Sequence, residues 1–314
     1  MDINRYSPKH KLNTKNLLNA DDFSESDIYE VLHLARTIKL QKQFKESMRP
    51  FENNAVGMLI SSANSRMRVS FELAVKQLGG ETLYLSPNDV DFSNGLTPYD
   101  AINVLKRYGV KGIVIKNGDN ELRSSLSASS PLPLINVLDA TNNPCQVLAN
   151  LFTMWERKGA LSGLSLAYVG NATDFKAHTL KAYSKCGISL TISSPESLTL
   201  NENELDEASQ FGDIVTVTDP YLAVKNADFI SSRFSFASGE KPSDDDKIAL
   251  APYRVDNDLL SCAKPDACFM HILPVEHSIE VDEEVLYGDK SLVFDQAENL
   301  LYIEKALLIL LFNR

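Results

Sequence analysis

Short apolar runs alternate with helical segments along most of this chain. The run 55–60 (AVGMLI) is apolar at every position, which is typical of a strand buried on both faces of a parallel sheet. A polar loop and a segment with helical periodicity follow it, and the same alternation recurs downstream. This order of elements predicts an α/β fold with open parallel sheets flanked by helices.

The expected elements fall into two sets. The first has strands near 55–60, 81–85, 112–116 and 134–138, with helices near 24–46, 65–78, 98–108 and 144–158. The second has strands near 164–169, 189–193, 213–217, 228–232 and 268–273, with helices between them, including 175–185, and a closing helix over 299–312. A chain of 314 residues that is 44% hydrophobic can build two such domains, each of about 150 residues, and we expect long helices to link them.

Composition narrows the classes of function. The formal net charge of -11 disfavours nonspecific binding to nucleic acid and favours small-molecule ligands. The N-terminus lacks the apolar core of a signal peptide, and no apolar run reaches the roughly 20 residues of a membrane span, so we expect a cytoplasmic protein. The four cysteines show no metal-binding spacing. We therefore expect neither a metal nor a cofactor, and no nucleic-acid or membrane partner.

The segment 64–72 (NSRMRVSFE) places two arginines where the first strand gives way to a helix. Unpaired N–H groups and the helix dipole favour an anion at a helix N-terminus, and the Arg66 guanidinium suits a phosphate. The segment predicts a phosphate site formed by Asn64, Ser65, Arg66 and Met67. The alternative interpretation is a capped helix with two surface arginines.

Four segments, in order, resemble motifs of the aspartate and ornithine carbamoyltransferases. The segment 64–72 is similar to the Ser-Thr-Arg-Thr-Arg motif, and 143–146 (NPCQ) is similar to His-Pro-x-Gln. The segment 269–274 (FMHILP) resembles the His-Cys-Leu-Pro loop of the ornithine branch, and 294–300 (FDQAENL) resembles Asp-x-Ala-Glu-Asn-Arg. Together they cover roughly residues 65 to 300 and identify the chain as a member of this family.

The resemblance implies carbamoyl transfer from carbamoyl phosphate to an amine, with Arg66, Lys116, Asn143 and Gln146 as catalytic residues. Negative charge grows on the carbonyl oxygen and then on the departing phosphate, so donors must surround both groups. Lys116 replaces an arginine and loses its planar fork, and Asn143 replaces a histidine and cannot become cationic. Leu300, in place of the final arginine, supplies no donor.

The implied second-substrate residues are Arg233, Ser238, His271, Ile272, Leu273 and Leu300. Arg233 stands where the ornithine branch has an aspartate that binds the α-amino group of ornithine. The reversed charge indicates either an acceptor that offers a carboxylate at this place or a surface arginine without a role. His271 is interpreted as a loop-positioning or core histidine, because no partner carboxylate is recognisable in the sequence.

The resemblance also implies how the domains and subunits are organised. We expect a carbamoyl-phosphate-binding domain over residues 1–147, completed by the C-terminal helix 299–314, and an amino-acid-binding domain over 148–298. A homotrimer is expected. Three hypotheses stay open: a transferase acting on ornithine or a related amino compound, a divergent enzyme with a changed substrate, and a noncatalytic ligand-binding paralogue.

Overall fold

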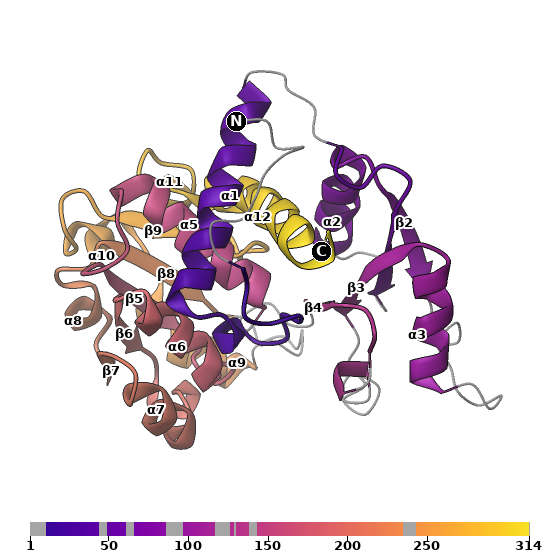
Figure 1. Cartoon of the computed structure of the whole chain (residues 1–314). Helices are drawn as coiled ribbons and strands as arrows, with labels where there is room; N and C mark the ends of the chain where they lie inside the picture. The colour runs from indigo at the N-terminus through magenta and orange to yellow at the C-terminus, as the bar shows by residue number, and fades with distance from the viewer. Residues whose placement is uncertain are drawn as a thin grey trace. The chain divides into compact units, whose positions relative to one another are not determined.

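The computed structural model describes residues 11–43, 49–60, 66–85, 97–116, 126–128, 130–137, 143–234 and 243–313. The chain divides into two compact units (Figure 1). The first unit contains Met1–Asp139, Asn143–Leu148 and Leu300–Arg314, and the second contains Ala140–Asn142 and Ala149–Asn299.

Strands and helices alternate in both units. The strands are β1 (Ala55–Ile60), β2 (Glu81–Leu85), β3 (Val110–Lys116), β4 (Leu134–Asn136), β5 (Ser165–Gly170), β6 (Ser189–Ser193), β7 (Ile214–Val217), β8 (Phe229–Arg233) and β9 (Cys268–Met270). The α-helices are α1 (Glu25–Gln43), α2 (Arg66–Gln77), α3 (Pro98–Arg107), α5 (Pro144–Lys158), α6 (Ala177–Lys185), α7 (Glu202–Ser209), α8 (Pro220–Val224), α9 (Asp244–Leu250), α10 (Asn257–Ser261), α11 (Glu283–Leu286) and α12 (Val293–Leu307). Short helical turns are η2 (Ala20–Asp22), η4 (Glu196–Leu198), η5 (Ala251–Tyr253) and the π-helical η6 (Leu308–Phe312).

The sheet of the first unit has the order β2-β1-β3-β4, and its paired strands are parallel. Strand β1 has β2 on one side and β3 on the other, so the direction of winding reverses between β1 and β3. The last residues of these two strands, Ile60 and Lys116, are register partners. In open α/β sheets, ligands bind outside the carboxyl ends of the strands at such a switch point. The topology therefore places Lys116 at the edge of this sheet where a ligand is expected.

The sheet of the second unit repeats this arrangement with the order β7-β6-β5-β8-β9, again parallel. Its winding reverses between β5 and β8, whose last residues, Gly170 and Arg233, are register partners. Gly170 has φ of 126°, and a Cβ added there would lie 2.3 Å from the carbonyl oxygen of Arg233. Only glycine fits this close approach of two strand ends.

Apolar layers cover the sheet of the first unit. On one face, Ile102 of α3 packs with Leu59, Ile113 and Ile115 of the strands. The C-terminal turn η6 contacts β3, and a Cβ added to Gly112 would lie 2.4 Å from the Phe312 ring. The end of the chain is thus part of the core that β3 helps to build.

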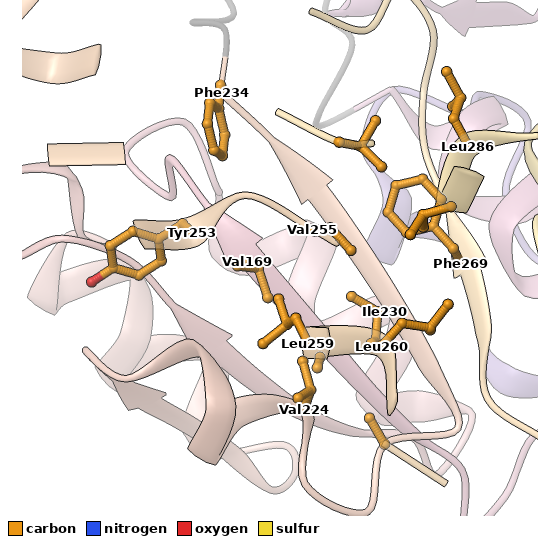
Figure 2. Packing of buried hydrophobic residues seen from close by; sticks show 14 of the residues in the cluster. Val169, Val224, Ile230, Phe234, Tyr253, Val255, Leu259, Leu260, Phe269 and Leu286 are labelled. Atoms are coloured by element: carbon orange, nitrogen blue, oxygen red, sulfur yellow. The ribbon is translucent and has the colours of Figure 1, made fainter. Parts of the chain in front are cut away.

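The core of the second unit joins its central strands to short helices. Figure 2 shows Val224 of α8 and Leu259 and Leu260 of α10 beside Val169 of β5 and Ile230 of β8. All five side chains are buried. The short helices α8 and α10 are stabilised by this burial more than by their own length, since five residues form little over one helical turn.

The predicted fold class is confirmed, and the differences from the sequence-based elements are local. Strand β9 ends at Met270 rather than near 273, because the backbone N–H of His271 leaves the ladder and donates to Gln296 Oε1 at 3.0 Å. Helix α12 begins at Val293 rather than at 299. Its first turn is partly polar, with Asp295 suited to a helix N-terminus, so the apolar periodicity alone did not reveal it. None of the helices in the described ranges is long and apolar enough to cross a membrane.

Candidate active site

Arg66 is the first residue of α2, the next described element after β1 in the chain. Its side chain is exposed, as a ligand-binding cation at a helix N-terminus should be. The side chain of Met67 is buried, so only its backbone N–H could contact an anion there. Asn64 and Ser65, the other predicted phosphate-binding residues, lie outside the described residues.

Lys116 ends β3 and lies within electrostatic range of Arg66. Burial lowers the pKa of the Lys116 ammonium, and the positive charge of Arg66 lowers this pKa further. Each of these two positive charges disfavours the other, and together they form a region of positive potential. A bound anion reduces the repulsion between them. The structure therefore brings two of the predicted catalytic residues together at the switch point between β1 and β3.

Arg68 has a different environment from Arg66. Its guanidinium lies 3.9 Å from a carboxylate oxygen of Glu72 and 5.6 Å from the centre of the Tyr84 ring. The Tyr84 hydroxyl donates to Glu72 at 2.5 Å. Burial and the Glu72 carboxylate both raise the pKa of Tyr84. These contacts link α2 to β2. Arg68 therefore has a structural role between this helix and this strand.

Asn143 and Gln146 lie at the start of α5 and are both buried. Asn143 Oδ1 accepts hydrogen bonds from the backbone N–H groups of Cys145 at 2.9 Å and Gln146 at 3.4 Å. This is an N-cap, which satisfies donors that the first helical turn leaves unpaired. With Oδ1 engaged, the Nδ2 amide is the group that Asn143 can offer to a carbonyl oxygen.

A fully buried carboxyl group, Glu304 of α12, lies beneath these residues. Ser70 of α2 donates to Glu304 Oε1 at 2.7 Å, whereas the buried Oε2 has no hydrogen-bond partner among the described residues. Burial raises the pKa of Glu304 well above its usual value. Burial, and then the nearby Glu304 carboxyl, raise the pKa of the Cys145 thiol, which fits the packing role expected of this cysteine rather than a nucleophilic one.

At the switch point of the second unit, Arg233 ends β8 beside Gly170 and Asn171. The backbone N–H of Asn171 donates to the carbonyl oxygen of Arg233 at 2.8 Å, and the Tyr168 hydroxyl donates to the carbonyl oxygen of Asn171 at 2.6 Å. Burial raises the pKa of Tyr168, while the charge of Arg233 acts in the opposite direction. The guanidinium therefore lies close enough to stabilise negative charge at this edge of the sheet.

His271 has a carboxylate partner that the sequence did not reveal. Its Nε2 lies 2.7 Å from Glu280 Oε1, which also accepts from Ser232 Oγ at 3.2 Å, and all three residues are buried. The interpretation of His271 as lacking a recognisable partner was therefore incomplete. Glu280 follows nine positions later on an irregular loop, and no periodicity marks the pair.

A second polar chain, which is partly buried, supports the same loop. Gln296 Oε1 accepts from the His271 backbone, and its Nε2 donates to Asn150 Oδ1 at 2.5 Å. Asn150 Nδ2 in turn donates to the Tyr183 hydroxyl at 2.8 Å. The loop after β9 is thus fixed to α5, α6 and α12 by polar groups whose burial makes each bond costly to lose.

The remaining predicted acceptor residues are Ile272, Leu273, Leu300 and Ser238. Ile272 and Leu273 are partly buried, and Leu273 packs against the core of the second unit. Leu300 of α12 is buried and belongs to the first unit, unlike the other described acceptor candidates. Ser238 lies outside the described residues. In the described part of the chain, no cluster of histidine, cysteine and carboxylate side chains could hold a metal ion.

Comparison with protein families gives a match over each unit. The carbamoyl-P binding domain of the aspartate/ornithine carbamoyltransferases matches residues 15–156. The Asp/Orn binding domain of the same family matches residues 162–311.

Individual proteins agree with these matches. The ornithine carbamoyltransferase of Bacillus subtilis (strain 168) is 37% identical over 301 residues, which cover 94% of this chain and 92% of the relative. The solved ornithine carbamoyltransferase of Pyrococcus furiosus superposes with a TM-score of 0.84 at 32% identity, covering 95% of this chain and 96% of that one. The corresponding structure from Burkholderia thailandensis E264 gives a TM-score of 0.82 at 30% identity, covering 95% and 99%.

Proposed function

The chain belongs to the aspartate/ornithine carbamoyltransferase family, and we propose that it transfers the carbamoyl group of carbamoyl phosphate to the amine of ornithine or a related amino compound. The proximity of Arg66 and Lys116 at the β1/β3 switch point carries this proposal. Two cations beside a helix N-terminus suit a ligand with a dianionic phosphate and a polarisable carbonyl.

In this proposal the phosphate lies at the N-terminus of α2. Arg66 binds it through two parallel hydrogen bonds, and Asn64, Ser65 and Met67 contribute backbone or side-chain donors. Lys116 acts as a point charge between the phosphate and the carbonyl group, since an ammonium cannot form a planar two-point contact.

The carbamoyl group lies against the start of α5. Asn143 Nδ2 donates to the carbonyl oxygen and Gln146 orients the amide. A neutral amine attacks the carbonyl carbon, the new C–N bond forms, and the C–O bond to phosphate breaks with its electron pair leaving on phosphate. The amine then loses a proton. Donors aimed at the two oxygens stabilise the charge that develops during these steps.

The acceptor binds to the second unit, at the carboxyl ends of its strands. The residues assigned to it are Arg233, Ser238, His271, Ile272, Leu273 and Leu300. The buried contacts of His271 with Glu280 and Gln296 support a positioning role for this histidine. The first unit, with its C-terminal helix, is accordingly the carbamoyl-phosphate-binding domain, and the second is the amino-acid-binding domain.

A homotrimer in the cytoplasm is part of the proposal. Val69 and Leu73 of α2 and Leu83 and Tyr84 of the edge strand β2 are all exposed. Apolar side chains on an edge strand and its neighbouring helix favour a contact with another subunit. None of the four cysteines, all of which lie in described segments, forms a disulfide, as is usual in a reducing compartment. Sedimentation of the purified protein tests the trimer.

The test of the function combines calorimetric binding of carbamoyl phosphate with an assay of its consumption in the presence of ornithine. Arg66→Gln should weaken binding by about ten- to a hundredfold, because a charge-assisted contact to phosphate is lost. Arg107→Gln removes the same charge from an exposed position of α3 and is the matched control. Absence of binding at millimolar ligand would refute the proposal, and binding without turnover of any amine would favour a noncatalytic ligand-binding protein.

A further inference from the structure

The buried carboxyl of Glu304 lies near the N-termini of two helices of the first unit, and the proposed reaction steps do not use it. Its Oε1 is 2.7 Å from the hydroxyl of Ser70, the fifth residue of α2. It is also close enough to Cys145, the second residue of α5, to raise the pKa of that thiol. All three residues belong to the same unit. No described residue hydrogen-bonds to Oε2, so a negative charge on this carboxyl is poorly stabilised.

Ser70 connects Glu304 with the end of α2 that is assigned to the phosphate. The Ser70 hydroxyl also lies 3.2 Å from the carbonyl oxygen of Met67, which follows Arg66 in the chain. It has one proton for these two acceptors. An ionised Glu304 holds this proton, because charge-assisted hydrogen bonds are the stronger ones, whereas a neutral Glu304 leaves it available to Met67. The charge of Glu304 thus determines how the first turn of α2 is hydrogen-bonded.

The start of α5 is the second place where this charge acts. The backbone N–H of Cys145 donates to Asn143 Oδ1 at 2.9 Å, and Asn143 and Gln146 are the residues assigned to the carbamoyl group. A helix N-terminus carries partial positive charge, which favours a bound anion. An ionised Glu304 competes with the ligand for the field of both helices, because a buried charge is screened little by solvent or salt.

Resting on the proposed function, we propose that Glu304 is a positioning residue of the carbamoyl phosphate site, and that carbamoyl phosphate binds preferentially to the protein in which Glu304 is neutral. The neutral acid supports the first turns of α2 and α5 without placing a negative charge near a dianionic ligand. The ionised form repels this ligand. Because linkage is reciprocal, bound carbamoyl phosphate favours the protonated carboxyl, and a molecule with ionised Glu304 takes up one proton on binding.

This linkage fixes the sign of the pH dependence. Burial raises the pKa of Glu304 in the folded protein, and the Ser70 hydrogen bond acts in the opposite direction. Affinity is therefore highest below this pKa and falls above it, until the pKa of the complex is passed. Ser70 lies about 6 Å along α2 from Arg66, so the charges of Glu304 and the phosphate are on the order of 10 Å apart. At this distance we expect a decrease in affinity of about tenfold.

Other charged and titratable groups on the elements around Glu304 are unchanged in the variants that test this proposal. They include Arg66, Arg68 and Glu72 of α2, Cys145 of α5, Lys305 of α12 and Lys116 of β3. Burial, and then the charge of Arg66, lower the pKa of Lys116, so loss of the Lys116 charge also weakens anion binding at high pH. A ratio of two affinities measured at the same pH removes this contribution, together with the ionisation of the ligand itself.

The test compares wild type with Glu304→Gln, which has the shape of the neutral acid and cannot ionise. Infrared difference spectra of the free proteins locate the pKa of Glu304 in the folded chain. Calorimetry then measures the affinity for carbamoyl phosphate from about one pH unit below this pKa to about two above it. The affinity of wild type relative to Glu304→Gln should fall about tenfold across this range. Glu81→Gln removes an exposed carboxyl from the same unit, and its ratio to wild type should stay constant.

Ser70→Ala provides a readout that a purely structural role would not change. It removes the hydrogen bond that lowers the pKa of Glu304, so the fall in affinity should move to higher pH. If the pair only held the helices together, both variants would weaken binding equally at every pH. Thermal unfolding shows whether each variant is folded, and the comparison with Glu304→Gln remains decisive if Ser70→Ala is not.

The outcomes separate the positioning role from the proposed function. An affinity ratio that stays constant across the pKa of Glu304 overturns the inference and leaves the transferase function standing. The infrared signal of a neutral carboxyl that persists until the protein unfolds has the same meaning, because no ionised form then exists. Absence of carbamoyl phosphate binding to wild type and Glu304→Gln alike refutes the proposed function, and the inference with it. A pH-dependent ratio without turnover of any amine supports the positioning role and refutes the transferase function.

Discussion

The buried carboxyl of Glu304 should make the stability of this protein depend on pH, and Glu304→Gln should remove that dependence. Glutamine has the shape of the protonated acid and can accept the hydrogen bond from Ser70 in the same way. The variant therefore changes little except the ability to ionise. Glu304 is fully buried, and no group in the described part of the chain hydrogen-bonds to its Oε2, so its charged form is poorly stabilised.

The size of the effect follows from one proton. In the unfolded chain the carboxyl ionises near pH 4.5, the ordinary value for a glutamate side chain, whereas burial raises the pKa of Glu304 in the folded protein. Between these two values the unfolded state has lost a proton that the folded state retains. Wild-type stability therefore falls by about 1.4 kcal/mol for each pH unit in this window, relative to the glutamine variant, and the difference becomes constant above the folded pKa.

Urea unfolding of both proteins between about pH 5 and pH 8, followed by circular dichroism, measures this difference. The advantage of Glu304→Gln should be smallest at the acidic end and should grow toward neutral pH. Glu298→Gln, which removes an exposed carboxyl from the same helix, is the control and should show no comparable slope. A difference between wild type and Glu304→Gln that stays constant across the range would refute the argument that Glu304 is buried as a neutral acid.

Three further substitutions test other parts of the structure. Gly112→Ala should destabilise the protein by about 1–3 kcal/mol, because the new Cβ would overlap the Phe312 ring, and the midpoint of thermal unfolding reports this. Asp228→Ala should cost about 1–3 kcal/mol in urea unfolding, since the buried carboxylate accepts from a backbone N–H at 3.0 Å, whereas its partner Lys264, at 2.7 Å, is partly exposed and can be solvated; an unchanged midpoint would contradict this. Lys116→Arg should tighten carbamoyl phosphate binding several-fold in calorimetry by restoring a planar donor pair, and unchanged binding would place Lys116 outside the site.

Local signals in the sequence were sufficient to predict the strands of both sheets and the helices that flank them. A strand buried on both faces needs a continuous apolar run, and a helix that covers it needs its own periodicity, so 55–60 and 144–158 were recognisable without knowledge of their partners. The end of β9 was predicted wrongly because its last expected residues remain apolar. A backbone bond from His271 to Gln296, 25 positions later, ends the strand instead.

The buried pairs of polar residues had no local signal in the sequence. Ser70 and Glu304 are 234 positions apart, and Ser232 and Glu280 are 48 apart. In the sequence, each of these four residues is indistinguishable from an exposed polar residue. Only the fold shows that it is buried. The pairing of strand ends likewise gave Arg233 its place beside Gly170, whereas the family motif alone indicated only a reversed charge.

The division of α12 between the two units has a consequence for biosynthesis. Residues from Leu300 onward belong to the first unit, and Phe312 packs against Gly112 of β3, 200 positions earlier. The second unit is nearly continuous in sequence, so its residues leave the ribosome as one block. The first unit cannot complete its fold until residues 300–314 have been translated. Although domains usually fold from the N-terminus during synthesis, here the domain that begins first is completed only after the second domain has been translated.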